Sequence, residues 1–249
     1  MFFKNLIKKI LKLFGYQLIR INYLKKLNID YYLYNYSSDE EYKSTQIKYN
    51  KQKLDNVWAD EETMNKIGLI LTEKYNKNSK ILGLCHGTRN GFEQNFLNDN
   101  FKKLDVIGTD ISPTVSEFKN SIQWDFHEIN SSWVNKFDFV YSNSLDQSNK
   151  PKEALKVWLN QLKKDGILIV EHSNDHGPQG ASKMDPFGVK PNVFSHLMIG
   201  WFGQQISIDL IKSIKSNSKI PIFIFLIKKN ISNVTVRDIK VSDLILETS

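Results

Sequence analysis

Short apolar runs alternate with helical stretches from residue 80 onward. These short apolar runs predict strands over residues 80–85, 104–109, 121–125, 137–142 and 166–171. The intervening stretches predict helices near residues 91–98 and 152–163, with a shorter helix between Ser112 and Asn120. Strands without a polar face are typical of a parallel sheet covered on both sides, so the pattern indicates an α/β, doubly wound fold.

The pattern after this region predicts a hairpin at the sheet edge. Pro191 to Trp201 has the spacing of a helix, and two apolar runs follow at residues 206–211 and 220–227. Only residues 212–219 separate the two runs, which is too few for a crossover helix, so we expect an antiparallel pair. The predicted sheet is therefore Rossmann-like, seven-stranded and mostly parallel, with an antiparallel terminal hairpin.

Helical patterns also precede the sheet. Residues 57–75 place apolar side chains on one face and predict a helix that covers the sheet. Serines and acids from Ser37 to Glu41 predict the start of another helix. Residues 1–14 combine Phe, Leu and Ile with Lys at helical spacing, which predicts a basic amphipathic helix at the N-terminus.

These elements divide the chain into four predicted parts. They are a basic amphipathic N-terminal helix at residues 1–27, a helical and aromatic lead-in at 28–56, the sheet domain at 57–228 and a tail at 229–249. Apolar and polar residues alternate in the tail, which is compatible with one more edge strand.

The net charge of +7 comes from the N-terminal arm. Of the 34 Lys and Arg residues, seven lie in residues 1–26 without any acid, which leaves 27 to balance the 27 Asp and Glu residues. A neutral body argues against a broad phosphate-binding face, so we expect no DNA partner. The arm, residues 1–14 above all, suits an anionic membrane surface; docking on its own domain or on a second copy, and binding of RNA, remain alternatives.

Cysteine and hydropathy patterns indicate the compartment. The chain has a single cysteine, Cys85, so it has no internal disulfide framework. It also shows no cleavable signal pattern and no run of about 18 apolar residues. We expect a cytoplasmic protein, attached at the inner membrane face if the basic arm binds lipid.

A glycine turn follows the first predicted strand of the sheet. The stretch from Ile81 to Gln94 reads ILGLCHGTRNGFEQ, with Gly87 and Gly91 between the apolar run and the next helix. Glycines in such a turn let the backbone approach a nucleotide-like ligand, because they lack a Cβ and adopt positive φ. Asp110 ends the next apolar run about 20 residues later, where a doubly wound fold places the acid that binds a ribose.

Together these motifs resemble class I S-adenosylmethionine-dependent methyltransferases. The resemblance covers residues 57–228 and rests on the order of the glycine turn, the acids after the second and third strands and the terminal hairpin. It is closest to a branch with a Gly-x-Arg-x-Gly-x-Glu turn, which corresponds here to Gly87, Arg89, Gly91 and Glu93. The chain departs from the commonest pattern of the family at Gly83, which replaces an acid, and at Cys85, which replaces a glycine.

The resemblance implies S-adenosylmethionine as the cofactor and assigns residues to its parts. The turn from Cys85 to Gly91 would hold the methionine part, and Asp110 would accept hydrogen bonds from both ribose hydroxyls. Asp125 would accept one from the adenine amino group, with Ile111 and Phe126 on either side of the ring. A helix cap for Asp110 and a loop cap for Asp125 are the structural alternatives.

Three further residues belong to the predicted cofactor site. Arg89 and Glu93, one helical turn apart, either pair with each other or reach the amino-acid end of the cofactor. Asn143 follows the fourth predicted strand, in a segment that faces the acceptor in the resembling family.

The candidate catalytic residues are Asp146, His172 and His176. They would act as a base on a hydroxyl acceptor. A divalent metal bound with the help of Asp185 and a purely structural role for the histidines are the alternatives, and we expect no metal site. The segment from Ser142 to Asp146 differs from the Asn-Pro-Pro-Tyr motif of enzymes that methylate amino groups of nucleic acids, which argues against a DNA base as acceptor.

The predicted function is methyl transfer from S-adenosylmethionine to a small molecule or glycan. A sugar hydroxyl or a carboxylate of a glycan or lipid-linked precursor is the expected acceptor. Two alternatives remain: a catalytically inactive binding or scaffold protein with this fold, and a nicotinamide-dependent oxidoreductase, which would need a fuller Gly-x-Gly-x-x-Gly turn. The pattern leaves the oligomeric state open.

Overall fold

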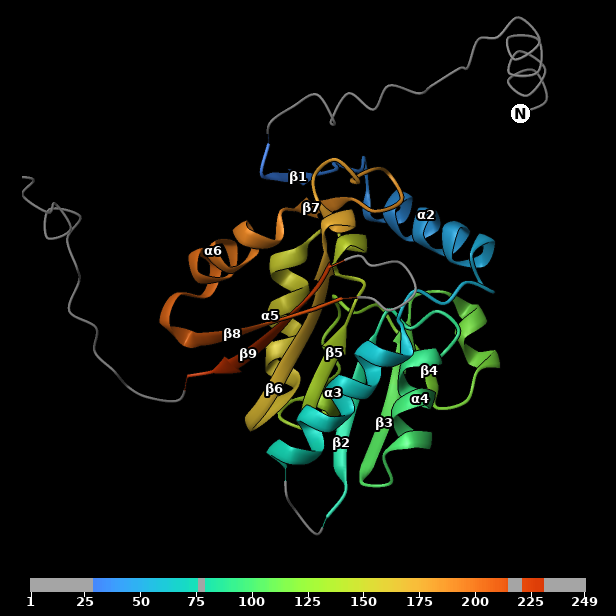
Figure 1. Cartoon of the computed structure of the whole chain (residues 1–249). Helices are drawn as coiled ribbons and strands as arrows, with labels where there is room; N and C mark the ends of the chain where they lie inside the picture. Colours follow the sequence, from blue (N-terminus) through green and yellow to red (C-terminus); the bar gives the residue numbers. More distant parts are fainter. Residues whose placement is uncertain (1–28, 76–78, 215–220, 231–249) are drawn as a thin grey trace, which may run out of the picture.

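The computed structural model describes residues 29–75, 79–214 and 221–230. Its main sheet has seven strands in the order β4-β3-β2-β5-β6-β9-β8 (Figure 1). Their bounds are β2 Ile81–His86, β3 Leu104–Asp110, β4 Ser121–Gln123, β5 Phe137–Ser142, β6 Leu162–Ser173, β8 Ile206–Ile214 and β9 Pro221–Lys229. Strands β2 to β6 pair in parallel, whereas β9 is antiparallel to both β6 and β8. The predicted Rossmann-like sheet and its terminal hairpin are thus confirmed.

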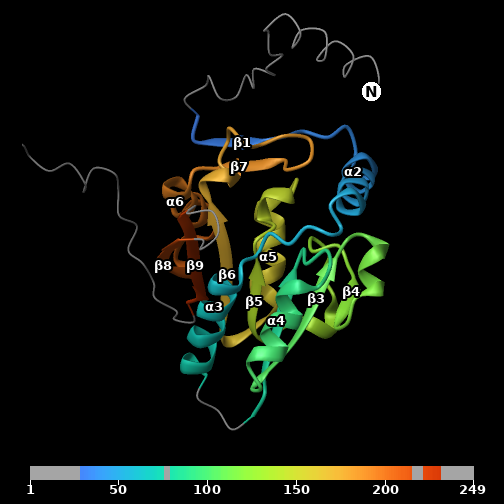
Figure 2. The ribbon, with the colours of Figure 1, turned by 45° about the vertical axis from the view of Figure 1, so that its right-hand side comes forward.

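A small cap lies over the carboxyl ends of the parallel strands (Figure 2). It contains β1 (Tyr31–Leu33), which pairs antiparallel with β7 (Phe187–Val189), and helix α2 (Asp39–Gln52). Ser38 caps α2, because its side chain accepts the backbone N–H of Glu41, so the predicted helix start is confirmed. The two strands have only three residues each, too few to show an alternating pattern in the sequence.

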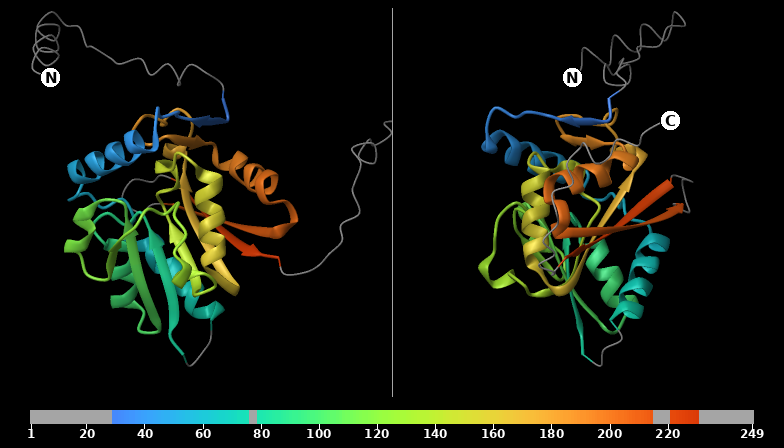
Figure 3. Two further views of the ribbon diagram at one scale, coloured as in Figure 1. Left: turned by 180° about the vertical axis from the view of Figure 1, so that it is seen from behind. Right: turned by 90° about the vertical axis from the view of Figure 1, so that its left-hand side faces the viewer.

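Helices cover both faces of the main sheet (Figure 3). Helices α3 (Glu61–Lys74) and α4 (Phe92–Asn100) lie on one face, and α5 (Pro151–Gln161) and α6 (Pro191–Phe202) lie on the other. Each face has its own hydrophobic cluster. Met64, Ile67 and Leu97 belong to the first, and Leu155, Trp158 and Phe194 belong to the second. Burial of strands on both faces is the physical reason for their continuous apolar runs.

The short helix predicted between Ser112 and Asn120 is a 3₁₀ turn, η2 (Pro113–Glu117). Its first residue is proline, and the Ser116 hydroxyl donates to the carbonyl of Pro113 at 2.7 Å. Strand β4 then begins at Ser121, so a single 3₁₀ turn is the helical part of this crossover.

Several predictions fall outside the described residues. These are the basic helix at residues 1–14 and the edge strand at 231–249, and the four-part division of the chain also stays a prediction. No helix in the part of the chain that the structure describes is long and apolar enough to cross a membrane.

An aromatic ring occupies the space where a side chain at Gly83 would lie. An acid therefore does not fit at this position. It pairs with Phe139 of β5, and a Cβ added to Gly83 would lie 2.1 Å from the Cζ atom of that ring. Any side chain here therefore displaces Phe139, which is fully buried.

We predict that Gly83→Ala lowers the free energy of unfolding by about 1–3 kcal/mol, because the new methyl group overpacks the core. Adding Phe139→Leu to this variant is expected to restore part of the loss. Gly200→Ala is the matched control: no atom lies within 4 Å of its Cβ position in α6, so we expect no loss of stability. Equal effects of the two alanines in chemical denaturation would contradict this packing argument.

Candidate functional site

The turn between β2 and α4 is clamped onto the end of β3. The backbone N–H groups of Gly87 and Thr88 donate to the carbonyl of Thr109 at 2.8 and 3.0 Å. Gly87, Arg89 and Gly91 all have positive φ, and Arg89 is the one that is not glycine. A Cβ at Gly87 would lie 2.5 Å from the Cβ of Ser144, so glycine is required where the loop after β5 approaches the turn.

The Asp110 carboxylate, at the end of β3, joins three segments of the chain. Its Oδ2 accepts the backbone N–H of Arg89 at 3.0 Å. Its Oδ1 accepts the backbone N–H of Ser112 and the side-chain amide of Asn50, both at 2.8 Å. Burial raises the pKa of Asp110, and the N–H donors oppose that shift. A carboxylate has about four acceptor positions, so about one remains, on Oδ2.

Asp125, just after β4, lies between a histidine and a lysine. Its Oδ1 accepts the backbone N–H of His127 at 3.0 Å and lies 2.8 Å from Nδ1 of the same ring. Nζ of Lys43 in α2 lies 3.3 Å from Oδ2. Burial raises the pKa of Asp125, but the contacts with His127 and Lys43 outweigh it and lower the pKa to about 2. Asp125 therefore caps its loop and is ionised at neutral pH.

A narrow cavity of about 20 Å³ adjoins these two acids. This volume has room for about one water molecule. The cavity is lined by Tyr42 and Gln46 of α2 and by Gly87, Asp110, Ile111, Asp125, Phe126 and Gln147. The predicted adenosine-binding residues are thus brought together, and α2 covers them.

Helix α2 is held by polar contacts. Its buried side chains are Tyr42, Thr45 and Gln46, none of them aliphatic. The Tyr42 hydroxyl donates to the carbonyl of Gln147 at 3.1 Å, and the Gln46 amide donates to the carbonyl of Met184 at 3.1 Å. Water can replace these hydrogen bonds when the helix moves, whereas the buried Tyr42 ring also packs edge-to-face on His127.

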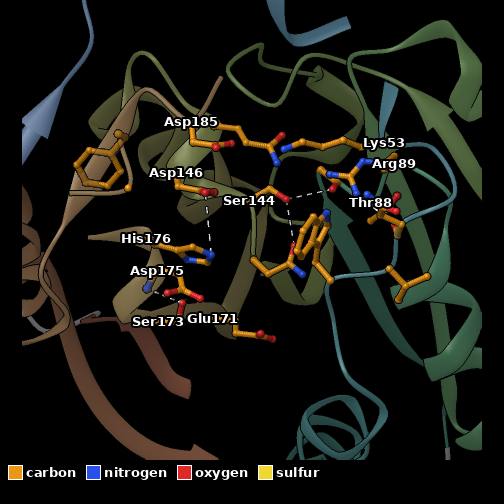
Figure 4. Close-up of a pocket in the computed structure, with 18 of the residues that line it drawn as sticks. Lys53, Thr88, Arg89, Ser144, Asp146, Glu171, Ser173, Asp175, His176 and Asp185 are labelled. Atoms are coloured by element: carbon orange, nitrogen blue, oxygen red, sulfur yellow. Dashed lines mark hydrogen bonds and ion pairs between the residues drawn. The ribbon is translucent and has the colours of Figure 1, made fainter. Parts of the chain in front are cut away.

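A larger cavity of about 220 Å³ lies beside the glycine turn (Figure 4). Gly87 and Gln147 line both cavities, so the two spaces adjoin. The predicted site residues that line the larger one are Gly87, Arg89, Glu93, Asn143, Asp146 and His176. Thr88 of the predicted turn also lines this cavity, together with Lys53, Glu171 and Asp175, which were not among the predicted site residues.

Glu93, in the first turn of α4, is buried with one oxygen free. Its Oε1 accepts the side-chain amide of Asn143 at 3.4 Å, and Oε2 has no hydrogen-bond partner among the described residues. Burial raises the pKa of Glu93 to about 7. The Arg89 guanidinium donates to the carbonyl of Asn56 at 3.2 Å rather than to Glu93. Arg89 and Glu93 therefore do not pair with each other, which was one of the two roles left open for them.

The two candidate histidines differ in position. His176 lines the larger cavity, and its Nε2 lies 4.0 Å from Oδ2 of Asp146. The His172 ring is buried, stacks on Phe194 and has Nε2 at 2.9 Å from the carbonyl of Val189. Burial lowers the pKa of His172 to about 3. His172 does not line the cavity, so we retain Asp146 and His176 as candidates and assign His172 a packing role.

Two residues of the turn motif point into the protein interior. The Cys85 thiol is buried in the cluster on the α3 and α4 face, and burial raises its pKa. His86 is also buried, with Nδ1 at 2.7 Å from the Thr109 hydroxyl and Nε2 at 2.8 Å from Oε1 of Gln161. The side chain of Cys85, a predicted cofactor residue, therefore faces away from both cavities.

The sequence contained one signal for the cover formed by α2. Tyr42, Gln46 and Asn50 recur every four residues and so share one face of the helix. A stripe of polar side chains has no apolar periodicity, so the pattern of hydrophobic positions does not reveal it.

Comparisons with known proteins show similarity at the level of fold. No protein-family model and no curated protein matches the chain. It is similar to the 1,6-didemethyltoxoflavin-N1-methyltransferase of Burkholderia thailandensis, solved with bound 1,6-didemethyltoxoflavin and S-adenosylhomocysteine. The TM-score is 0.60 at 12% identity, over 79% of this chain and 92% of the other.

Two other methyltransferases give a similar result. The plantazolicin methyltransferase BpumL, in complex with a triazolic desmethylPZN analog and S-adenosylhomocysteine, has a TM-score of 0.57 at 12% identity, over 77% of this chain and 98% of the other. The N-methyltransferase NodS from Bradyrhizobium japonicum WM9, in complex with S-adenosylhomocysteine, has a TM-score of 0.55 at 11% identity, over 74% and 98%. The chain thus has the fold of S-adenosylmethionine-dependent methyltransferases, and its assignment to the Gly-x-Arg-x-Gly-x-Glu branch stays a prediction.

The raised pKa of Glu93 predicts how its substitution changes stability with pH. The unfolded chain releases this proton near the ordinary value of 4.5, and the folded protein releases it near 7. The folded protein therefore loses stability as the pH rises through that window. We expect Glu93→Gln, relative to the parent, to gain up to about 3 kcal/mol of unfolding free energy between about pH 4.5 and pH 7.

Chemical denaturation of both proteins at several pH values measures this difference. Glu73→Gln is the matched control, because Glu73 is exposed on α3. A difference between Glu93→Gln and the parent that stays constant with pH would contradict the burial of an ionisable carboxyl group at this position.

Proposed function

We propose that this protein is a methyltransferase that binds S-adenosylmethionine along the carboxyl ends of β2 to β5. The observation that carries the proposal is the junction of the two cavities at Gly87, with a buried carboxylate on either side. Asp110 lines the narrow cavity and Glu93 lines the larger one. The fold shared with methyltransferases of known structure supports the same reading.

The residues of the narrow cavity fit the adenosine part of this cofactor. The Asp110 carboxylate has an acceptor position left for a ribose hydroxyl, and it gains another if Asn50 leaves. Asp125 is ionised and would accept a hydrogen bond from the adenine amino group. Ile111 and Phe126 line the same cavity and would flank the ring.

The residues of the larger cavity fit the amino-acid part. The free Oε2 atom of Glu93 would accept from the α-ammonium group, whose charge favours the ionised form of this carboxyl group. The Thr88 hydroxyl and Nε of Arg89 are also buried without partners among the described residues. We infer that Glu93 supplies the negative charge that Gly83 lacks, so the altered strand motif is compatible with cofactor binding.

The bound cofactor supplies a methyl group on a sulfonium, whose leaving group is a neutral thioether. The chain's own residues need only align the acceptor with that methyl group and exclude water. Asp146 and His176 lie on the wall of the larger cavity and would contact the acceptor. A glycan or lipid-linked acceptor, which the sequence suggested, rests only on the basic arm and on the absence of nucleic-acid signatures.

Binding of adenosine requires α2 to move outward, because the narrow cavity has room for about one water molecule. Water can replace the hydrogen bonds of α2 during this motion, and Asn50 is the contact that competes directly for Asp110. We infer that α2 opens for the cofactor and closes over it.

Substitution of Asp110 tests the placement of the ribose. Asp110→Asn keeps the size of the side chain but removes the ionised acceptor, so we expect affinity for S-adenosylmethionine and S-adenosylhomocysteine to fall by about a hundredfold or more. Calorimetric titration measures both ligands. Asp105→Asn is the control, because Asp105 is exposed on the same strand. Parent-like binding by a folded Asp110→Asn variant would contradict the placement of the ribose.

Substitution of Asn50 tests the competition with α2. Asn50→Ala removes a donor that occupies Asp110, so we expect S-adenosylhomocysteine to bind about tenfold more tightly, which corresponds to about 1.4 kcal/mol. Gln52→Ala, an exposed position in the same helix, is expected to bind like the parent. Weaker binding by Asn50→Ala would show that Asn50 contacts the cofactor instead of competing with it.

A further inference from the structure

One wall of the larger cavity is rich in acids from separate segments. Asp146 belongs to the 3₁₀ turn η4 (Leu145–Gln147), and Asp175 belongs to η5 (Asn174–His176). Glu171 lies near the end of β6, and Asp185 comes from the loop before β7. Figure 4 shows these four side chains on one side of the cavity, with Thr88 and Arg89 on the other. This arrangement gives the wall a negative charge where an acceptor would lie.

Asp146 on this wall lacks a partner that its burial demands, and the half-buried Asp185 lines the same cavity. Oδ1 of Asp146 is buried without a hydrogen-bond partner among the described residues. Burial and the charge of Asp146 raise the pKa of Asp185 to about 6, against the opposing charges of Lys53, His176 and Arg89. Two like charges sheltered from water are unfavourable unless a cation or a strong donor lies between them.

Glu93 is a further acid that lines this cavity. Glu93 is 7% exposed, and its free Oε2 atom belongs to the same cavity. If the α-ammonium group of the cofactor binds the Glu93 carboxylate, as proposed above, the carboxylates of Asp146 and Asp185 are left to bind the acceptor. An ammonium group has three N–H donors and a positive charge, so it satisfies both carboxylates at once. A carboxylate or phosphate on the acceptor would be repelled by the same wall.

We propose that the methyl acceptor is a small molecule with an amino group, held between Asp146 and Asp185. This inference rests on the proposed methyltransferase function and names the acceptor class of that site. Trp58 and Phe187 line the same cavity and offer aromatic surface to the remainder of such a molecule.

The reaction balances with groups that the site holds. The bound ammonium group gives a proton to the Asp185 carboxylate, which passes it to solvent. The freed lone pair on nitrogen forms a bond to the methyl carbon, and the electron pair of the broken sulfur–carbon bond stays on sulfur. The positive charge thus moves from sulfur to nitrogen, beside Asp146, where a fixed carboxylate stabilises it. One proton is released for each methyl group transferred.

Three probes of one shape test the proposal: benzylamine, benzyl alcohol and benzoate. Saturation-transfer NMR measures their binding to the full chain, with and without S-adenosylhomocysteine. We expect benzylamine to bind at millimolar concentration and the other two to bind at least about tenfold more weakly. Asp146→Asn and Asp185→Asn should each weaken benzylamine binding about tenfold, whereas Asp99→Asn, exposed on α4, should not.

The outcomes separate this proposal from the proposed function. One contrary outcome is protein that binds S-adenosylhomocysteine but binds benzoate or benzyl alcohol more tightly than benzylamine, or does not bind benzylamine at all. This outcome overturns the amine acceptor and leaves the methyltransferase function standing. Benzylamine binding that survives both aspartate substitutions also overturns it. Benzylamine binding by protein that binds neither S-adenosylmethionine nor S-adenosylhomocysteine supports the amine site and overturns the methyltransferase function.

Discussion

The buried carboxylate of Asp110 is the interaction on which the arrangement of the site depends. It holds the turn after β2 through Arg89, the start of the loop after β3 through Ser112, and the cover helix α2 through Asn50. A buried carboxylate must be satisfied by donors, so its position at the end of a parallel strand fixes where the backbone around it lies.

The strand ends and glycine turn on one side of this carboxylate are held by apolar packing, whereas helix α2 on the other side is held largely by polar side chains. The strand ends and the glycine turn are anchored in two apolar clusters, one on each face of the sheet, and so form a rigid edge. Helix α2 rests on the same edge through tyrosine, threonine, glutamine and asparagine side chains. A polar cover on an apolar scaffold is suited to open and close while the scaffold keeps its shape.

The sheet could be predicted from the sequence because strands that are buried on both faces appear there as short apolar runs. The strands, the terminal hairpin and Asp110 at a strand end all follow from continuous apolar runs and their spacing. The cap could not be predicted in the same way, since β1 and β7 have three residues each and α2 buries polar side chains. Packing also decided what spacing could not: His172 stacks on Phe194, Cys85 lies in a core cluster and Phe139 fills the space at Gly83.

In the proposed function, the Asp110 carboxylate gives up its hydrogen bond from Asn50 of α2 and accepts hydrogen bonds from a ribose. A crystal structure of the protein with S-adenosylhomocysteine tests it most directly. We expect ribose hydroxyls on the Asp110 carboxylate, the adenine beside Ile111 and Phe126, and Asn50 displaced from the position in which it donates to Oδ1. A ligand bound elsewhere, with the hydrogen bond from Asn50 to Asp110 intact, would contradict it.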